Sequence, residues 1–151
     1  PMREQTTGTI LQNWQPGFAD KFGKETLHLE HSLHKSELFT DERLASLIEK
    51  ADRSNYHVNT RAAGADGKKR RREGELGTLS GLEILEAVRT GDIWINLCAP
   101  QLADPAYGEM LRDMYSEFEN RVPGLDTFKH CTTILISSPN AYVPYHCDVP
   151  G

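Results

Sequence analysis

Two side chains near the end of this sequence, His146 and Asp148, have the types and spacing needed to hold a metal ion together. They lie in a segment that we expect to be extended, where side chains two positions apart point to the same side of the strand. An imidazole and a carboxylate on one side can bind one ion. A second, distant histidine would complete the two-histidine, one-carboxylate set that holds Fe(II) and leaves open positions for oxygen and a co-substrate. Cys147 points to the other side, so we do not expect it to be a ligand.

A second group of candidate ligands is the row of histidines at His28, His31 and His34. On a strand, residues three apart face opposite sides, so His31 would point away from the other two. Zinc needs ligands that converge on one point. We therefore prefer ordinary surface histidines to a metal site at this position.

The charge distribution argues against a nucleic-acid-binding protein. The 151 residues include 17 Lys and Arg and 22 Asp and Glu, a net charge of −5. The one basic run, residues 68–72, lacks interleaved aromatic residues and is followed by Glu73 and Glu75. We interpret it as part of an exposed, solvated loop over residues 61–77 rather than as a nucleic-acid patch or a localisation signal.

The sequence has the composition of a cytoplasmic protein. Its longest apolar stretches have only a few residues, far short of the ~20 that cross a bilayer, and no basic start leads into an apolar run. The three cysteines, an odd number without a CxxC pair, favour a reducing compartment over a disulfide framework. We expect Cys98, Cys131 and Cys147 each to be a small buried apolar residue.

The apolar periodicity predicts an α+β chain in which helices dominate the first part and strands the last. Residues 1–24 are expected to form an irregular arm, and residues 25–151 the body of the domain. Predicted helices start at residue 40 or 41, cover 79–88, and run from 104 to just before Pro123. Predicted strands cover 26–31, 56–59, 92–97 and 130–137, and an extended segment covers 142–148.

The segment 134–148, Ile-Leu-Ile-Ser-Ser-Pro-Asn-Ala-Tyr-Val-Pro-Tyr-His-Cys-Asp, resembles cupin-like proteins related to the JmjC-type Fe(II)/2-oxoglutarate oxygenases. Upstream, residues 31–39, 94–97 and 104–107 look like the N-terminal half of bacterial members, so the resemblance covers about 27–151. It implies an α+β fold of N-terminal helices plus the first strands of a double-stranded β-helix (a jelly roll or cupin), truncated at the C-terminus.

The resemblance also implies that His146 and Asp148 are the first two iron ligands. The family's distal histidine, and the basic residue that pairs with 2-oxoglutarate, would lie beyond Gly151. Many relatives have Thr three residues before the first ligand, where it can hydrogen-bond 2-oxoglutarate. This chain has Val143 there, without a hydroxyl, which weakens the case for 2-oxoglutarate more than the case for the metal.

These observations predict part of a hydroxylase-type oxygenase that uses Fe(II), and 2-oxoglutarate if the co-substrate is kept, on a small-molecule or protein substrate. With two of three protein ligands, we expect this chain alone to bind metal weakly and to be inactive. The alternative is a non-catalytic cupin-like module that binds a small ligand or a protein partner, for example in a transcriptional regulator. We expect no membrane partner, and self-association through an open sheet edge.

Overall fold

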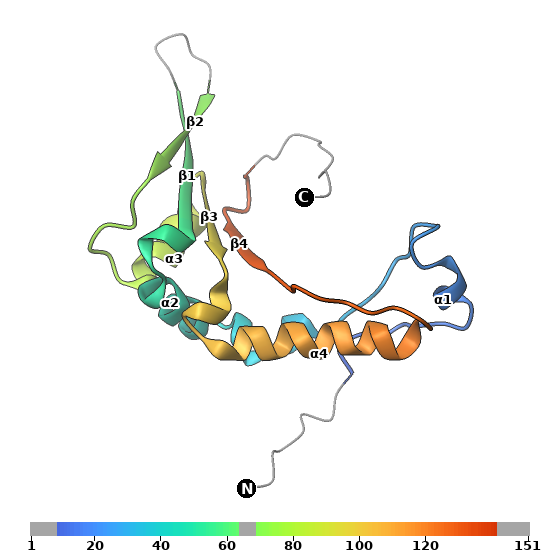
Figure 1. The fold of residues 1–151 in the computed structure, drawn as a ribbon. Helices are drawn as coiled ribbons and strands as arrows, with labels where there is room; N and C mark the ends of the chain where they lie inside the picture. Colours follow the sequence, from blue (N-terminus) through green and yellow to red (C-terminus); the bar gives the residue numbers. More distant parts are fainter. Residues whose placement is uncertain (1–8, 64–68, 142–151) are drawn as a thin grey trace, which may run out of the picture.

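The computed structural model describes residues 9–63 and 69–141 (Figure 1). They form four α-helices and one antiparallel sheet of four strands in the order β2-β1-β3-β4. The α+β class is confirmed, and the described sheet is open. The helices are α1 (Phe18–Lys21), α2 (Asp41–Lys50), α3 (Gly81–Thr90) and α4 (Pro105–Arg121). The strands are β1 (Tyr56–Ala63), β2 (Lys69–Gly74), β3 (Ile93–Cys98) and β4 (Thr133–Ser137), and short 3-10 turns are η1 (Leu33–Lys35), η2 (Glu37–Phe39), η3 (Arg53–Asn55) and η4 (Pro100–Leu102).

Helices α2 and α3 are each preceded by a capping residue that can be recognised in the sequence. The hydroxyl of Thr40 accepts a hydrogen bond from the N–H of Arg43, which satisfies one free donor in the first turn of α2. Ser80 and Glu83 form a reciprocal capping box at the start of α3. The two helices meet at Gly81, where an added Cβ would lie 2.2 Å from the carbonyl oxygen of Ala45. Only glycine fits at this contact.

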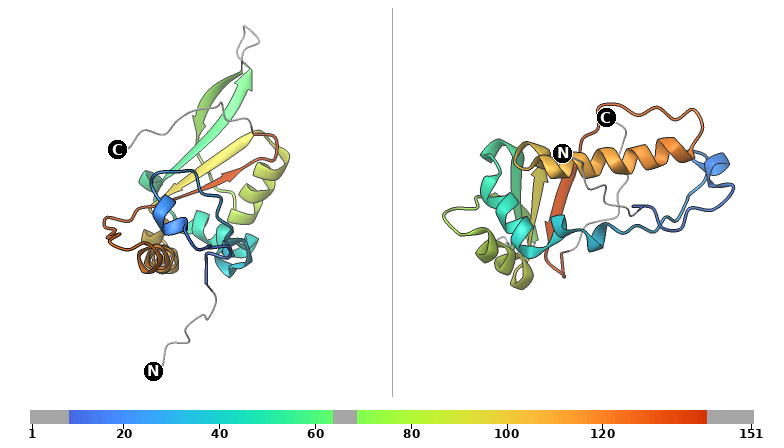
Figure 2. Two further views of the ribbon diagram at one scale, coloured as in Figure 1. Left: turned by 90° about the vertical axis from the view of Figure 1, so that its right-hand side faces the viewer. Right: turned by 90° about the horizontal axis from the view of Figure 1, so that it is seen from below.

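The hydrophobic core lies between these two helices and one face of the sheet (Figure 2). Val58 from β1 and Ile95 and Leu97 from β3 are buried there against apolar side chains of α2 and α3. Tyr107 of α4 is fully buried at the end of this core, and its hydroxyl donates to the carbonyl of Leu38 at 2.7 Å. Burial is the main cause that raises the pKa of Tyr107. The core thus joins all three longer helices to the sheet.

Residues 9–24 are attached to the far end of α4 (Figure 1). The carboxylate of Glu117 accepts hydrogen bonds from the N–H groups of Ile10 and Leu11. Aromatic rings add a second contact, because the Trp14 and Phe118 ring centroids lie 6.2 Å apart in an edge-to-face arrangement. Phe22 also contacts Phe118, with ring centroids 5.7 Å apart.

Two local predictions are wrong. Residues 61–77 are not simply a loop, because β1 continues to Ala63 and β2 occupies 69–74 as its antiparallel partner. Charged residues are common on an edge strand, where backbone pairing does not require an apolar side chain. The strand predicted at 26–31 is reduced to one bridge between Leu11 and His31. Within residues 9–63 and 69–141, this segment pairs with no other strand beyond that single bridge.

None of the helices in the described ranges is both long enough and apolar enough to cross a membrane.

Candidate functional site on the sheet face away from α2 and α3

The face of the sheet turned away from α2 and α3 carries mostly polar side chains, and we call it the polar face. Strand residues alternate between the two faces, so the neighbours of the core residues point to this side. The register places Asn96 beside both His57 and Leu135, and Trp94 beside Asn59 and Ser137. The residues of β1, β3 and β4 on the polar face are His57, Asn59, Trp94, Asn96, Cys98, Thr133, Leu135 and Ser137.

An ion-pair cluster lies at one border of the polar face, formed by His57 of β1, Glu73 of β2, Arg53 of η3 and Glu75 just after β2. Nδ1 of His57 is 2.9 Å from the Glu73 carboxylate. Nε of Arg53 is 2.7 Å from the carboxylate of Glu75, and this contact is the main cause that raises the pKa of Arg53. All four side chains are about half exposed or more, so water screens these pairs and each contributes little to stability. The cluster places an imidazole and a carboxylate at the border of the face.

Ser138 fixes the point at which the chain leaves β4. Its N–H donates to the carbonyl of Ile93 at 2.9 Å, and its hydroxyl accepts from the N–H of Ile93 at 2.9 Å. The same hydroxyl donates to the carbonyl of Val88 in α3. The N–H of Ala141 then donates to the carbonyl of Ser138 at 3.0 Å, which closes a turn. The side chain of Ser138 is therefore a buried anchor at the end of β4, on the side of the sheet that α3 covers.

The predicted metal ligands His146 and Asp148 lie outside the described residues, as do Val143 and Cys147. The structure therefore places none of them relative to the polar face. The structure describes the chain as far as Ala141, in the turn that Ser138 anchors, five residues before His146.

The histidine row does not converge on a metal site. His28, His31 and His34 are all exposed, and the ring centroids of His31 and His34 lie 6.2 Å apart. Across residues 9–63 and 69–141, no group of three or more His, Cys, Asp or Glu side chains is arranged to hold a metal ion.

The cysteines differ from the expectation of burial. Cys98 is half-buried at the end of β3, whereas Cys131 is exposed just before β4, and both are free thiols. Cys131 departs from the prediction because β4 begins at Thr133, three residues later than the strand expected from the sequence. Cys131 therefore lies in the segment that precedes β4, where its side chain is exposed.

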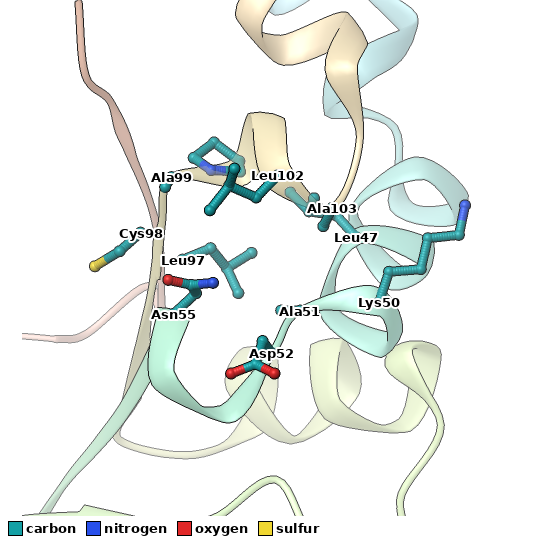
Figure 3. Close-up of a pocket in the computed structure, with 11 residues that line it drawn as sticks. Leu47, Lys50, Ala51, Asp52, Asn55, Leu97, Cys98, Ala99, Leu102 and Ala103 are labelled. Atoms are coloured by element: carbon teal, nitrogen blue, oxygen red, sulfur yellow. The ribbon is translucent and has the colours of Figure 1, made fainter.

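A small cavity of about 70 Å³ lies between the end of α2 and the end of β3 (Figure 3). Leu47, Leu97 and Ala103 line it, and Asp52 stands at its border, while the thiol of Cys98 points away from it. A water molecule occupies about 30 Å³ in the liquid, so this space takes no more than a couple of waters. It is too small to bind a substrate.

A larger groove of about 910 Å³ runs between α4 and the η1–η2 segment. Glu109, Asp113 and Glu117 line it from successive turns of α4, and Lys35 and Arg43 line it from the other side. Its size suits a small ligand. Most of its lining residues are charged or polar and it is open to water, whereas typical ligand pockets are enclosed by mainly apolar side chains.

Sequence reasoning did not single out the polar residues of β1 and β3. Their signal was present, because His57, Asn59, Trp94 and Asn96 alternate with core residues along the two strands.

We compared the chain with protein-family models, curated proteins and solved structures, and none of these comparisons found a match.

Proposed function

We propose that this chain is part of a cupin-like, Fe(II)-dependent oxygenase in which His146 and Asp148 are two of the metal ligands. The observation that carries the proposal is the His-x-Asp pair, which begins eight residues after the Ser138 anchor. In the described part of the chain, α2 and α3 pack on one face of the sheet that precedes this anchor, and the other face is mostly polar. Such a sheet is consistent with the first half of a jelly roll whose inner face binds a substrate.

The donor chemistry of the pair fits the metal. An imidazole nitrogen and a carboxylate oxygen are both ligands that Fe(II) accepts, and two protein ligands leave other positions open. Bound iron would supply the activation of oxygen that hydroxylation requires. The chain's own residues would have simpler roles. His146 and Asp148 would hold the ion, and Asn96 and Trp94 on the polar face would contact the substrate.

A second candidate function is a cupin-like module that binds a small ligand or a protein without catalysis. Val143 favours it, because a valine at this position has no hydroxyl to hydrogen-bond 2-oxoglutarate. The two candidates differ in whether the chain binds a divalent transition metal through His146 and Asp148.

Cobalt titration separates the two functions, since Co(II) takes the same ligands as Fe(II) and has a visible absorption spectrum. We expect the chain to develop a Co(II)–protein spectrum, and we expect His146→Ala and Asp148→Ala each to weaken binding by more than about tenfold. Loss of a residue that only supports a ligand already costs about ten- to a hundredfold.

His34→Ala is the matched control, because His34 is an exposed histidine outside the predicted site. Its affinity for Co(II) should equal that of the unmodified chain. If the unmodified chain does not bind Co(II), or if His146→Ala binds as well as His34→Ala, the oxygenase proposal is wrong and the binding module is favoured.

A further inference from the structure

The outer edge of β4 is open in the described part of the chain. The sheet order β2-β1-β3-β4 makes β4 an edge strand, with β3 as its neighbour on one side. Leu135, at its centre, is 56% exposed. An exposed edge strand presents a row of backbone donors and acceptors to which another strand can add.

The register shows which backbone groups face outward. The N–H of Ser138 donates to the carbonyl of Ile93, and the N–H of Ala99 donates to the carbonyl of Thr132. Hydrogen-bonded pairs alternate along an antiparallel ladder, so the backbone groups of Ile134 and Ile136 also face β3. Those of Thr133, Leu135 and Ser137 therefore point away from β3, toward the open edge.

The two edges of the sheet differ in charge. The other edge strand, β2, has the sequence Lys-Arg-Arg-Arg-Glu-Gly, and like-charged side chains discourage the addition of another strand. β4 has the sequence Thr-Ile-Leu-Ile-Ser, without a charge, a proline or a glycine. Its sequence thus contains none of the charged residues or prolines that commonly protect an edge strand, and its β-branched residues favour a strand.

We propose that the outer edge of β4 binds the β4 edge of a second copy of this chain, in an antiparallel arrangement centred on Leu135. The sequence is self-complementary in this arrangement. Leu135 lies opposite Leu135 of the second copy, and Thr133 lies opposite Ser137. The outward backbone groups of each copy meet those of the other, and neither copy brings a charge to the contact. The two sheets join into one, and this dimer does not depend on the proposed metal site.

Sedimentation velocity over a range of protein concentrations tests the dimer. We expect the apparent mass to rise with concentration from that of the 17.0 kDa chain toward twice that value. Leu135→Lys places two like charges opposite each other, and we expect the dissociation constant to increase at least about tenfold. Leu102→Lys is the matched control, because Leu102 is 71% exposed on η4. It should dimerise like the unmodified chain.

Disulfide trapping tests the register even if Leu135→Lys disturbs folding. In a chain whose three native cysteines are replaced by serine, Leu135→Cys should form an intermolecular disulfide on oxidation. Thr133→Cys should form much less, because Thr133 lies opposite Ser137 rather than itself. The proposal is overturned by a chain that stays monomeric at all concentrations, by Leu135→Lys dimerising normally, or by equal cross-linking at the two positions.

Discussion

The hydroxyl of Ser138 accepts a hydrogen bond from the backbone N–H of Ile93 at 2.9 Å. This bond joins the residue that follows β4 to the residue that begins β3. Since the hydroxyl also donates to the carbonyl of Val88, one buried side chain connects both strands to the last turn of α3. Ser138 therefore fixes the point at which the chain leaves the sheet, eight residues before His146 in the sequence.

Replacing Ser138 by alanine should destabilise the protein by about 1–3 kcal/mol, the cost of leaving a buried donor or acceptor without its partner. The N–H of Ile93 and the carbonyl of Val88 would both lose the hydroxyl. Urea denaturation followed by circular dichroism measures this change. Ser116→Ala on the exposed side of α4 is the control and should change stability by less than about 0.5 kcal/mol. Equal effects of the two variants would show that Ser138 is not an anchor.

The contact between α2 and α3 predicts a large effect at Gly81. In Gly81→Ala the new Cβ would lie 2.2 Å from the carbonyl oxygen of Ala45, which is backbone and cannot rotate away. We expect destabilisation of about 3 kcal/mol, the upper end of the cost of overpacking. In the control Gly74→Ala, the Cβ would meet only Val58 at 3.8 Å, an ordinary contact. Thermal denaturation of both variants is the measurement, and a Gly81→Ala protein as stable as Gly74→Ala contradicts the close helix packing.

The buried phenol of Tyr107 should contribute through its hydroxyl as well as its ring. Tyr107→Phe keeps the packing but leaves the carbonyl of Leu38 without its donor, so we expect a loss of about 1–2 kcal/mol in the free energy of unfolding. Tyr115→Phe is a matched control, because the ring of Tyr115 stacks on His130 at 4.1 Å and the substitution keeps that ring. Should both variants unfold at the same urea concentration as the unmodified chain, the Tyr107 hydrogen bond adds no net stability.

The loop between α4 and β4 should lose stability in acid. The hydroxyl and the backbone N–H of Thr127 both donate hydrogen bonds to the Glu119 carboxylate. The hydroxyl is the larger cause, ahead of the N–H, of a pKa of the Glu119 carboxyl below the ordinary value of 4.5, and the nearby charge of His130 also lowers it. A lowered pKa in the folded state stabilises the protein above pH 4.5, and this stability is lost as the pH falls through the folded pKa.

Thr127→Val removes the hydroxyl and so removes part of this effect. We expect the variant to be less stable than the unmodified chain at pH 7, and we expect the difference to shrink as the pH is lowered below 4.5. Urea midpoints measured at several pH values give the comparison. A difference that does not change with pH would mean that the Thr127 hydroxyl does not act through the Glu119 carboxylate.

Much of the fold could be predicted from local patterns. The helices α2, α3 and α4 have capping residues and apolar stripes that depend only on neighbours in the sequence, and each of them formed. β2 could not be found in this way, because its charged sequence looks like a loop and becomes a strand only by pairing with β1. At residues 26–31 the error was the opposite: the alternation predicted a strand, but only one bridge formed. A strand also requires a pairing partner, and the local sequence does not reveal one.

The candidate site also has a part that could be predicted from the sequence and a part that required the structure. His146 and Asp148 were chosen from residue chemistry and spacing, and they stay a prediction because they lie outside the described residues. The alternation along β1 and β3 already separates polar residues from core residues, but only the sheet register brings His57 from β1 and Asn96 from β3 side by side. The role of Ser138 likewise depends on contacts with residues more than forty positions earlier in the chain.

Fe(II) affinity measured without oxygen at a series of pH values tests the proposed metal site most directly. An imidazole binds metal only after losing its proton, so we predict that affinity falls as the pH is lowered through the range where histidine becomes protonated. His146→Ala should bind more than about tenfold more weakly at pH 7.5, while His34→Ala should match the unmodified chain. Fe(II) binding that is unchanged in His146→Ala would contradict the assignment of His146 as a ligand.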